Sequence, residues 1–200
     1  MRIEGGTLRG RTLLAPPGPA TRPTDGRTRE MLFNSLGARV VGARFLDLYA
    51  GSGSVGIEAL SRGAAFCVFI EDDFRAVKPL KDNLQKLRIK DTSQVWSANA
   101  RPSLEKLVEG GEEFDIVFAD PPFTHPKEAA EILKRIDACP RLFHNQMDDF
   151  GGPIVVIQHS IRTRLPPIEN LRLLRFKKAG ESGLSFFIPN TLEPALADTQ

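Results

Sequence analysis

The four residues Asp120-Pro121-Pro122-Phe123 form the segment whose residue types point most directly to a chemical reaction. They follow the run 114–119, which has the composition of a buried strand. The Asp120 carboxylate and the Pro121 backbone carbonyl are acceptors for the two N–H groups of an amine on an aromatic ring. Such an amine is a poor nucleophile, because its lone pair is delocalised into the ring. Two well-placed acceptors would turn the lone pair toward an electrophilic carbon, so the segment predicts methylation of an exocyclic amino group.

The prolines and the phenylalanine of this segment fit the same chemistry. Consecutive prolines hold the backbone and remove N–H donors that would face the amine, and Pro122 would border the substrate. Phe123 could stack on a nucleic-acid base, which contributes about 1–3 kcal/mol per base. A base reaches such a site only when it is unstacked from its neighbours. The alternative interpretation is a proline-rich turn in which Phe123 fills the core.

A glycine-rich loop upstream predicts a nucleotide cofactor. Gly51, Gly53 and Gly56 match the pattern GxGxxG between an expected strand and an expected helix. Glu71 lies 20 residues after Gly51, where a carboxylate can accept hydrogen bonds from both ribose hydroxyls of an adenosine. An NAD-linked oxidoreductase would share this spacing, but the chain leaves little room for a nicotinamide-side domain. Asp47, four residues before Gly51, is typical of enzymes that bind S-adenosylmethionine and release S-adenosylhomocysteine, and it would face the cationic methionine part.

Asn99 and Ala100 follow a third expected strand and complete the predicted cofactor site. A side-chain amide at the carboxyl end of a parallel strand could read the edge of the adenine ring. Asn99 is equally suited to cap a helix or a turn. We find no spacing of histidine, cysteine and carboxylate residues that predicts a metal site, and no Ser-His-Asp arrangement.

The elements that must position these residues alternate between strand and helix, which predicts an α/β fold. We expect a Rossmann-like, doubly wound, mostly parallel seven-stranded sheet with an antiparallel hairpin at its C-terminal edge. A small N-terminal hairpin and helix would extend it. The predicted strands are 45–49, 66–71, 94–97, 114–119, 154–159, 171–178 and 184–189, and the predicted helices are 55–62, 74–88, 103–108 and 127–136, with a possible kink at Pro79.

Three regions are expected along the 200-residue chain. Residues 1–40 would form an extension that faces RNA and cofactor, with a helix capped by Thr24 or Asp25 that stops at Gly37. Residues 41–190 would form the methyltransferase domain, and residues 191–200 a flexible tail.

Composition and charge limit the class to which the protein can belong. Hydrophobic residues make up 41% and charged residues 26%, as in ordinary globular proteins. No apolar run is long enough to span a membrane, and the N-terminus lacks the apolar core of a signal peptide, so a cytoplasmic location is expected. The net charge of +2 hides basic segments at 1–30 and 161–180 around an acidic remainder. This distribution predicts an anionic partner, although solvated faces would give the same pattern.

With these motifs assembled, the chain resembles the bacterial 16S ribosomal RNA guanine-N2 methyltransferases of the RsmD type over about residues 1–190. The shared features are the loop from Asp47 to Gly56, the Asn99-Ala100 pair, the Asp120 motif, the Arg-Pro-Thr segment at 22–24 and the closing hairpin around 180–187. The sequence departs from the expected pattern at three places. Gln158 stands where an acidic residue is expected, Phe187 stands where tyrosine is common, and no basic residue follows Glu71 directly.

The resemblance implies a substrate and a partner. The substrate would be one guanine of 16S rRNA, within an assembling or assembled small subunit, and no obligate protein partner is evident. Substrate contacts are expected from Arg9, Arg11, Arg22, Thr24 and Arg27. The RNA-facing surface would further include Arg29, Arg162, Arg164, Arg172, Arg175, Lys177 and Lys178.

Two other functions stay open at this point. A DNA adenine-N6 methyltransferase would use the same Asp-Pro-Pro-aromatic motif on an exocyclic amine, but no DNA-recognition domain is evident in 200 residues. A non-catalytic RNA-binding module on the same fold would bind RNA in a salt-dependent manner without methyl transfer.

Overall fold

A computed structural model describes residues 1–16, 25–125, 127–143 and 152–190, and its centre is a seven-stranded sheet. The strand order is β3-β2-β1-β4-β5-β7-β6. The first five of these strands are parallel, whereas β7 runs antiparallel to both β5 and β6. The strands are β1 (Arg44–Leu48), β2 (Phe66–Glu71), β3 (Ser93–Ser97), β4 (Ile116–Ala119), β5 (Ile154–Ser160), β6 (Leu171–Ala179) and β7 (Ser182–Pro189).

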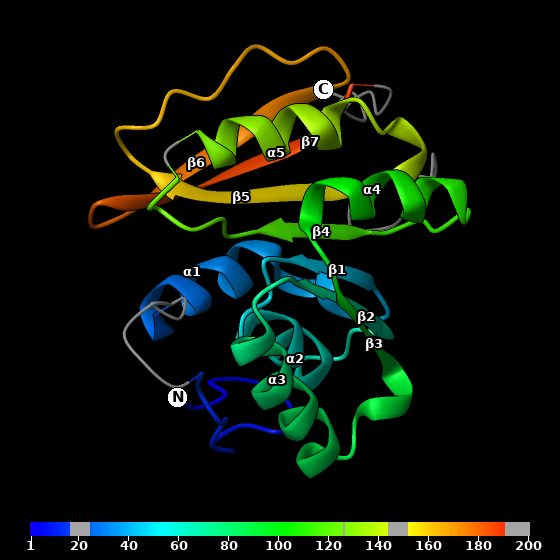
Figure 1. Ribbon diagram of the computed structural model, residues 1–200. Helices are drawn as coiled ribbons and strands as arrows, with labels where there is room; N and C mark the ends of the chain where they lie inside the picture. The colour runs from blue at the N-terminus through cyan, green and yellow to red at the C-terminus, as the bar shows by residue number, and fades with distance from the viewer. Residues whose placement is uncertain (17–24, 126, 144–151, 191–200) are drawn as a thin grey trace, which may run out of the picture.

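Helices cover both faces of the sheet, which confirms the predicted α/β, doubly wound architecture (Figure 1). On one face lie α1, α2 and α3, and on the other lie α4 and α5. Within the described residues, no helix combines the length and apolar character needed to cross a membrane. The helices are α1 (Gly26–Leu36), α2 (Ser54–Ser61), α3 (Phe74–Leu87), α4 (Ala100–Glu109) and α5 (Glu128–Asp137).

Local signals explain where the helices begin and end. The Asp25 side chain accepts a hydrogen bond from Thr28 N at 2.8 Å, which caps α1 as predicted. Gly37 ends α1 with φ of 58°, a conformation that costs glycine little. Three predicted starts are wrong by two or more residues. The α4 helix begins at Ala100 rather than 103, because Asn99 caps it, β4 begins at Ile116 rather than 114, and β7 begins at Ser182 rather than 184.

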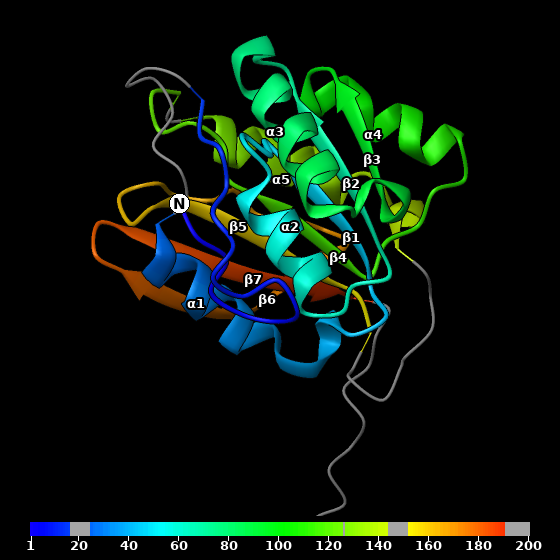
Figure 2. The same ribbon diagram turned by 90° about the horizontal axis from the view of Figure 1, so that it is seen from below.

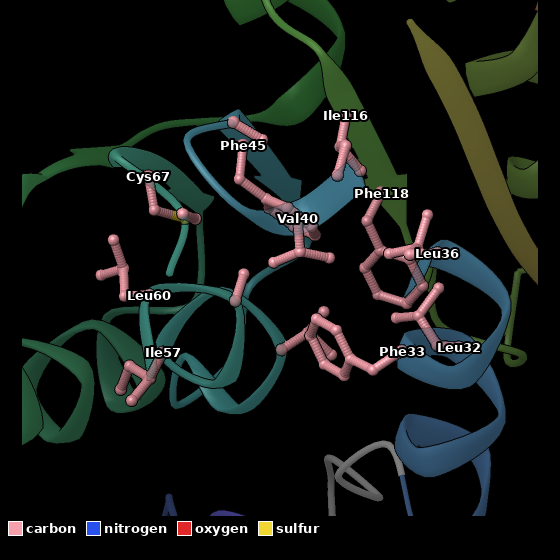
Figure 3. Close-up of a cluster of buried hydrophobic side chains, with 14 of the residues drawn as sticks. Leu32, Phe33, Leu36, Val40, Phe45, Ile57, Leu60, Cys67, Ile116 and Phe118 are labelled. Carbon is pink, nitrogen blue, oxygen red and sulfur yellow. The ribbon is translucent and has the colours of Figure 1, made fainter. Parts of the chain in front are cut away.

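The core consists of two apolar layers, one on each face of the sheet. The layer under α1, α2 and α3 includes Leu36, Phe45 and Phe118 (Figure 3). The layer under α4 and α5 includes Leu46, Val117 and Ile157. Neighbouring residues of a strand therefore belong to opposite layers, as the pleat of a buried strand requires. This alternation fixes the face of the sheet on which each polar side chain at a strand end emerges.

The N-terminal residues form a small hairpin on the α1–α3 face and pass between α1 and α2 (Figure 2). Arg2 pairs with Thr12, and Ile3 is buried in the core layer of that face. Arg29 of α1 donates from Nε to Glu58 of α2 at 3.3 Å. Both side chains are almost fully buried, with 2% and 0% exposed. The prediction that Arg29 lies on an RNA-facing surface is therefore wrong, because this guanidinium joins two helices.

Candidate active site

The parallel strands bring the predicted site residues to one edge of the sheet. The glycine loop follows β1, Glu71 ends β2, Asn99 follows β3 and Asp120 follows β4. Because these strands are parallel neighbours, their carboxyl ends meet at the same edge. Asp120 N lies 3.5 Å from the Leu48 carbonyl oxygen, so the motif at 120–123 begins directly beside the glycine loop. Segments as far apart as residues 47 and 120 thus form one site.

The glycine loop turns sharply between β1 and α2. Tyr49, Gly51 and Gly53 have φ values of 65°, 57° and 84°, all in the left-handed region. A Cβ on Gly53 would lie 2.4 Å from the Leu80 side chain, whereas a Cβ on Gly51 would meet open space. Gly53 is thus required for packing against α3. The open side of Gly51 leaves room for a ligand to approach the backbone.

Asp47 holds the start of α2 from beneath the loop. Its Oδ2 atom accepts a hydrogen bond from Gly56 N at 2.9 Å, and its side chain is 2% exposed. Its pKa is raised to about 8, chiefly by burial; the bond from Gly56 opposes the rise, and the nearby Asp120 and Glu71 carboxylates contribute to it. A buried acid with this surrounding charge favours a positively charged neighbour.

Glu71 lies at the rim of the same loop. Its Oε2 atom accepts a hydrogen bond from Gly51 N at 2.6 Å, and Oε1 accepts one from Asp73 N at 2.8 Å. Burial raises the pKa of Glu71, and the two backbone hydrogen bonds partly offset the rise. The carboxylate is thereby oriented at the end of β2, next to the open side of Gly51.

Asn99 and Ala100 lie at the adjoining strand end. Asn99 Oδ1 accepts a hydrogen bond from Arg101 N at 3.2 Å, and Nδ2 donates to Asp72 at 3.0 Å. The capping role considered for Asn99 is therefore present, while its contact with an adenine ring stays a prediction. Ala100 is 4% exposed and begins α4.

The motif after β4 forms an exposed turn. Pro121 is buried, whereas Pro122 is exposed, and the Pro122 carbonyl accepts a hydrogen bond from His125 N at 3.0 Å. Phe123 is 53% exposed. The alternative in which Phe123 fills the core is therefore wrong. An aromatic ring exposed at this edge is available to contact a planar ligand.

Three residues that were not predicted from the sequence form a hydrogen-bonded group near this turn. Tyr49 OH donates to Glu128 Oε1 at 2.5 Å, and Arg101 pairs with the same carboxylate, with Nε 3.1 Å from Oε1. Burial raises the pKa of the Tyr49 hydroxyl, and the arginine and tyrosine lower the pKa of Glu128 against its own burial. The group joins the glycine loop, α4 and the start of α5. Residues 49, 101 and 128 have no sequence spacing that would have revealed it.

The predicted substrate-binding residues are partly brought together. Arg9 and Arg27 line one hollow of about 440 Å³, together with Arg62 and the acidic Glu4 and Glu30. Arg11 is exposed but does not line this hollow. Arg22 and Thr24 lie outside the described residues. Arg175 is partly buried over the Phe186 ring and donates to the Ser35 carbonyl, so its predicted place on an RNA face is wrong.

The carboxylates and the open glycine backbone at this edge of the sheet fit S-adenosylmethionine. Asp47, Glu71 and Asp120 lie close enough for the charges of the last two to raise the pKa of the first. A cationic ligand would relieve this repulsion, since an opposite charge nearby favours the ionised carboxylate. The methionine part of S-adenosylmethionine carries a sulfonium and an ammonium group. The open side of Gly51 beside the Glu71 carboxylate suits the ribose of its adenosine part.

Comparison with known proteins agrees with this geometry. The family model described as "Conserved hypothetical protein 95" matches residues 1–188. The chain is 45% identical over 186 residues to "Ribosomal RNA small subunit methyltransferase D" of Escherichia coli, covering 90% of this chain and 86% of that protein. It is 36% identical over 188 residues to "Putative rRNA methyltransferase YlbH" of Bacillus subtilis, covering 94% and 98%.

A solved structure extends the likeness to three dimensions. The structure titled "Putative methyltransferase yhhF from Escherichia coli" aligns with a TM-score of 0.77 and 34% identity, over 94% of this chain and 96% of the other. Sequence and fold therefore agree over nearly the whole length. The chain belongs to the Conserved hypothetical protein 95 family, the family of the RsmD-type methyltransferases.

Proposed function

We propose that this chain transfers a methyl group from S-adenosylmethionine to the exocyclic N2 amine of a guanine in 16S ribosomal RNA. The observation that carries the proposal is the Asp120–Phe123 turn, which presents an exposed Phe123 at the same sheet edge as the glycine loop. Family membership and the names of the Escherichia coli and Bacillus subtilis relatives support rRNA as the acceptor. The name of the Escherichia coli relative supports the small subunit as the context.

The cofactor would be held around the glycine loop. When bound, S-adenosylmethionine supplies an electrophilic methyl group on a sulfonium. Asp47 would ionise beside this cation, and its contact with Gly56 N would keep the loop in place. Glu71 would accept hydrogen bonds from the ribose hydroxyls, and Asn99 would read the adenine edge. The proposed cofactor-binding residues are Asp47, Gly51, Gly53, Glu71, Asn99 and Ala100.

The reacting amine would be held by the turn after β4. The Asp120 carboxylate and the Pro121 carbonyl accept its two N–H groups, which directs the nitrogen lone pair away from both acceptors. The nitrogen forms a bond to the methyl carbon while the carbon–sulfur bond breaks, which leaves a neutral thioether. The surplus proton on nitrogen passes to the Asp120 carboxylate or to water. Phe123 stacks on the extruded base and Pro122 borders it.

The RNA backbone would lie along the cationic part of the N-terminal extension. Arg9 and Arg27 line the same hollow, where they can contact phosphates together. Glu4 and Glu30 line the same hollow, and Glu4 pairs with Arg29 at 3.7 Å. Arg11, Arg22 and Thr24 complete the proposed substrate-binding set.

The test is transfer of labelled methyl to three acceptors: naked rRNA, 30S particles from a strain without this activity, and duplex DNA. Nucleoside digestion and mass spectrometry identify the product, and N2-methylguanosine from rRNA or particles is the expected result. We expect Asp120→Ala to lower the rate constant of transfer by about 10²–10³-fold, the range for loss of a positioned polar group in an active site. Formation of N6-methyladenine in DNA would contradict the proposed rRNA substrate. RNA binding without any methylated product would favour the non-catalytic RNA-binding module.

A further inference from the structure

An exposed aromatic ring lies on β6, on a different strand from the proposed cofactor and catalytic residues. Phe176 is 46% exposed, although it lies in a strand next to the buried β7. A Cβ on Gly183 would lie 2.3 Å from its ring, so the ring covers the glycine backbone directly. The missing side chain at position 183 is thus what allows the ring to pack on the sheet.

Strand register aligns this ring with the end of β4. Phe176 pairs with Ser185 of β7, Ser185 pairs with Ile157 of β5, and Ile157 pairs with Ala119, the residue before Asp120. The Cα atom of Phe176 therefore lies three strands from that of Ala119, or about 14 Å at the usual strand spacing. The turn between β6 and β7 is at the same end of the sheet as the turn after β4 (Figure 1).

The Phe176 ring packs beside the buried His159. The centroid of the His159 ring lies 5.9 Å from that of Phe176. His159 is 5% exposed, and its Nε2 and Nδ1 atoms lie 2.8 Å from Ser185 Oγ and 2.9 Å from the Ser160 carbonyl oxygen. Burial lowers the pKa of His159, and the hydrogen bond with the Ser160 carbonyl opposes the shift. The exposed Phe176 ring thus packs beside an imidazole whose two nitrogens both have hydrogen-bond partners.

Exposed basic residues lie on the same strand and on the segment after β5. Lys178 lies two residues after Phe176 on β6, and Arg164 lies in the segment after β5. A hydrogen bond from Ile161 N to the Glu181 carbonyl brings that segment to the hairpin turn. The pair of Arg162 with Glu181 is almost fully exposed, at 85% and 92%, so water and salt weaken it. Exposed cations beside an aromatic ring are what single-stranded nucleic acids bind.

We propose that Phe176 is a second stacking surface, which binds an unpaired nucleotide a few positions from the methylated base. Lys178, Arg162 and Arg164 would contact the backbone phosphates of the same strand. The inference rests on the proposed function and adds a site for flanking RNA, on the side of the catalytic turn away from the cofactor loop. The charge of the surface favours RNA over a protein as the occupant.

The experiment compares Phe176→Ala and Phe176→Trp with the wild type. Val41→Ala is the matched control, because Val41 is an exposed apolar residue (64%) that precedes β1 at the opposite end of the sheet. Three quantities are measured: the dissociation constant for an rRNA fragment, KM and kcat for labelled methyl transfer, and the dissociation constant for S-adenosylmethionine. Thermal melts check that each variant is folded.

We expect Phe176→Ala to raise the RNA dissociation constant and KM by about 5- to 150-fold, the equivalent of one stacked base. Phe176→Trp should retain wild-type binding, and kcat and cofactor affinity should not change. Equal RNA binding by Phe176→Ala and Val41→Ala would overturn the proposal. An effect with 30S particles but not with naked rRNA would overturn it in favour of a protein contact. Wild-type enzyme that makes no N2-methylguanosine would refute the proposed function, while the RNA-binding measurement would still test the stacking surface.

Discussion

The buried Asp47 carboxyl makes the stability of the cofactor-free protein depend on pH. Its pKa is raised from 3.8 to about 8 in the folded protein. A raised pKa means that the protonated form is favoured by folding, so the contribution to stability is complete below pH 3.8 and is lost as pH rises through 8. Between pH 6 and pH 8 the folded protein holds about one more proton than the unfolded chain at this site. At about 1.4 kcal/mol per pH unit, the wild type should lose about 2 kcal/mol over this interval.

Asp47→Asn removes this proton while keeping an oxygen that can accept the hydrogen bond from Gly56 N. The variant should therefore lack this part of the pH dependence. For a chain of this length, about 2 kcal/mol corresponds to a difference in Tm of about 4–8 °C. Differential scanning fluorimetry of both proteins at pH 6, 7 and 8 measures it. Curves for wild type and Asp47→Asn that run parallel within 1 °C would refute the argument.

Binding of the cofactor should lower the raised pKa of Asp47. A cation beside Asp47 favours the carboxylate, so binding of S-adenosylmethionine at pH 6.5 should release a proton from the wild type and fewer from Asp47→Asn. Isothermal titration calorimetry in two buffers with different ionisation enthalpies measures the number of protons. Equal proton release by the two proteins would show that Asp47 does not face the cationic part of the ligand.

Three further predictions concern stability. Arg29→Met should destabilise the protein by about 1–3 kcal/mol, because it removes the buried guanidinium that binds Glu58 Oε2, while Arg62 still pairs with Oε1; urea unfolding measures this, and an unchanged free energy of unfolding would contradict it. Gly56→Ala should cost about 1–3 kcal/mol, because the new methyl group would lie 2.3 Å from the Phe69 ring; a Tm equal to that of the wild type would disprove the clash. Gln158→Leu should leave stability unchanged or raise it by about 1 kcal/mol, because Oε1 is buried and accepts no hydrogen bond from the described residues; a clear fall in Tm would show that this oxygen has a partner.

Much of the fold was predictable from local pattern. The order of strands and helices, the cap at Asp25 and the stop at Gly37 were predicted from the sequence and are confirmed. The predicted starts of α4 and β4 were wrong because a side-chain hydrogen bond, rather than the apolar pattern, marks where each element begins. The cap at Asn99 starts α4 earlier than its apolar residues suggest. The Asp115 carboxylate accepts a hydrogen bond from Arg44 N at 2.6 Å, at the point where the strand pattern predicted that β4 had already begun.

Surface placement was predicted less well than secondary structure. A basic residue is expected to be exposed, because burial of a charge is costly without a partner. Arg29 is an exception, because its partner Glu58 comes from a different helix, 29 residues away. No local pattern links the two residues, so Arg29 was predicted on the RNA face. The same reason explains why the Tyr49–Glu128–Arg101 group was not predicted.

The class of fold and the residue types available for chemistry follow from the amino-acid sequence, because periodicity, glycine turns and the Asp-Pro-Pro-Phe segment are local properties of the chain. Which of these residues meet depends on how the strands pair. Parallel pairing brings Asp47, Glu71 and Asp120 to one edge, where their charges interact, and antiparallel pairing of β5, β7 and β6 aligns Phe176 with that edge. Contacts between distant segments depend on strand order and register, which local sequence does not encode, and the electrostatics of the site follow from those contacts.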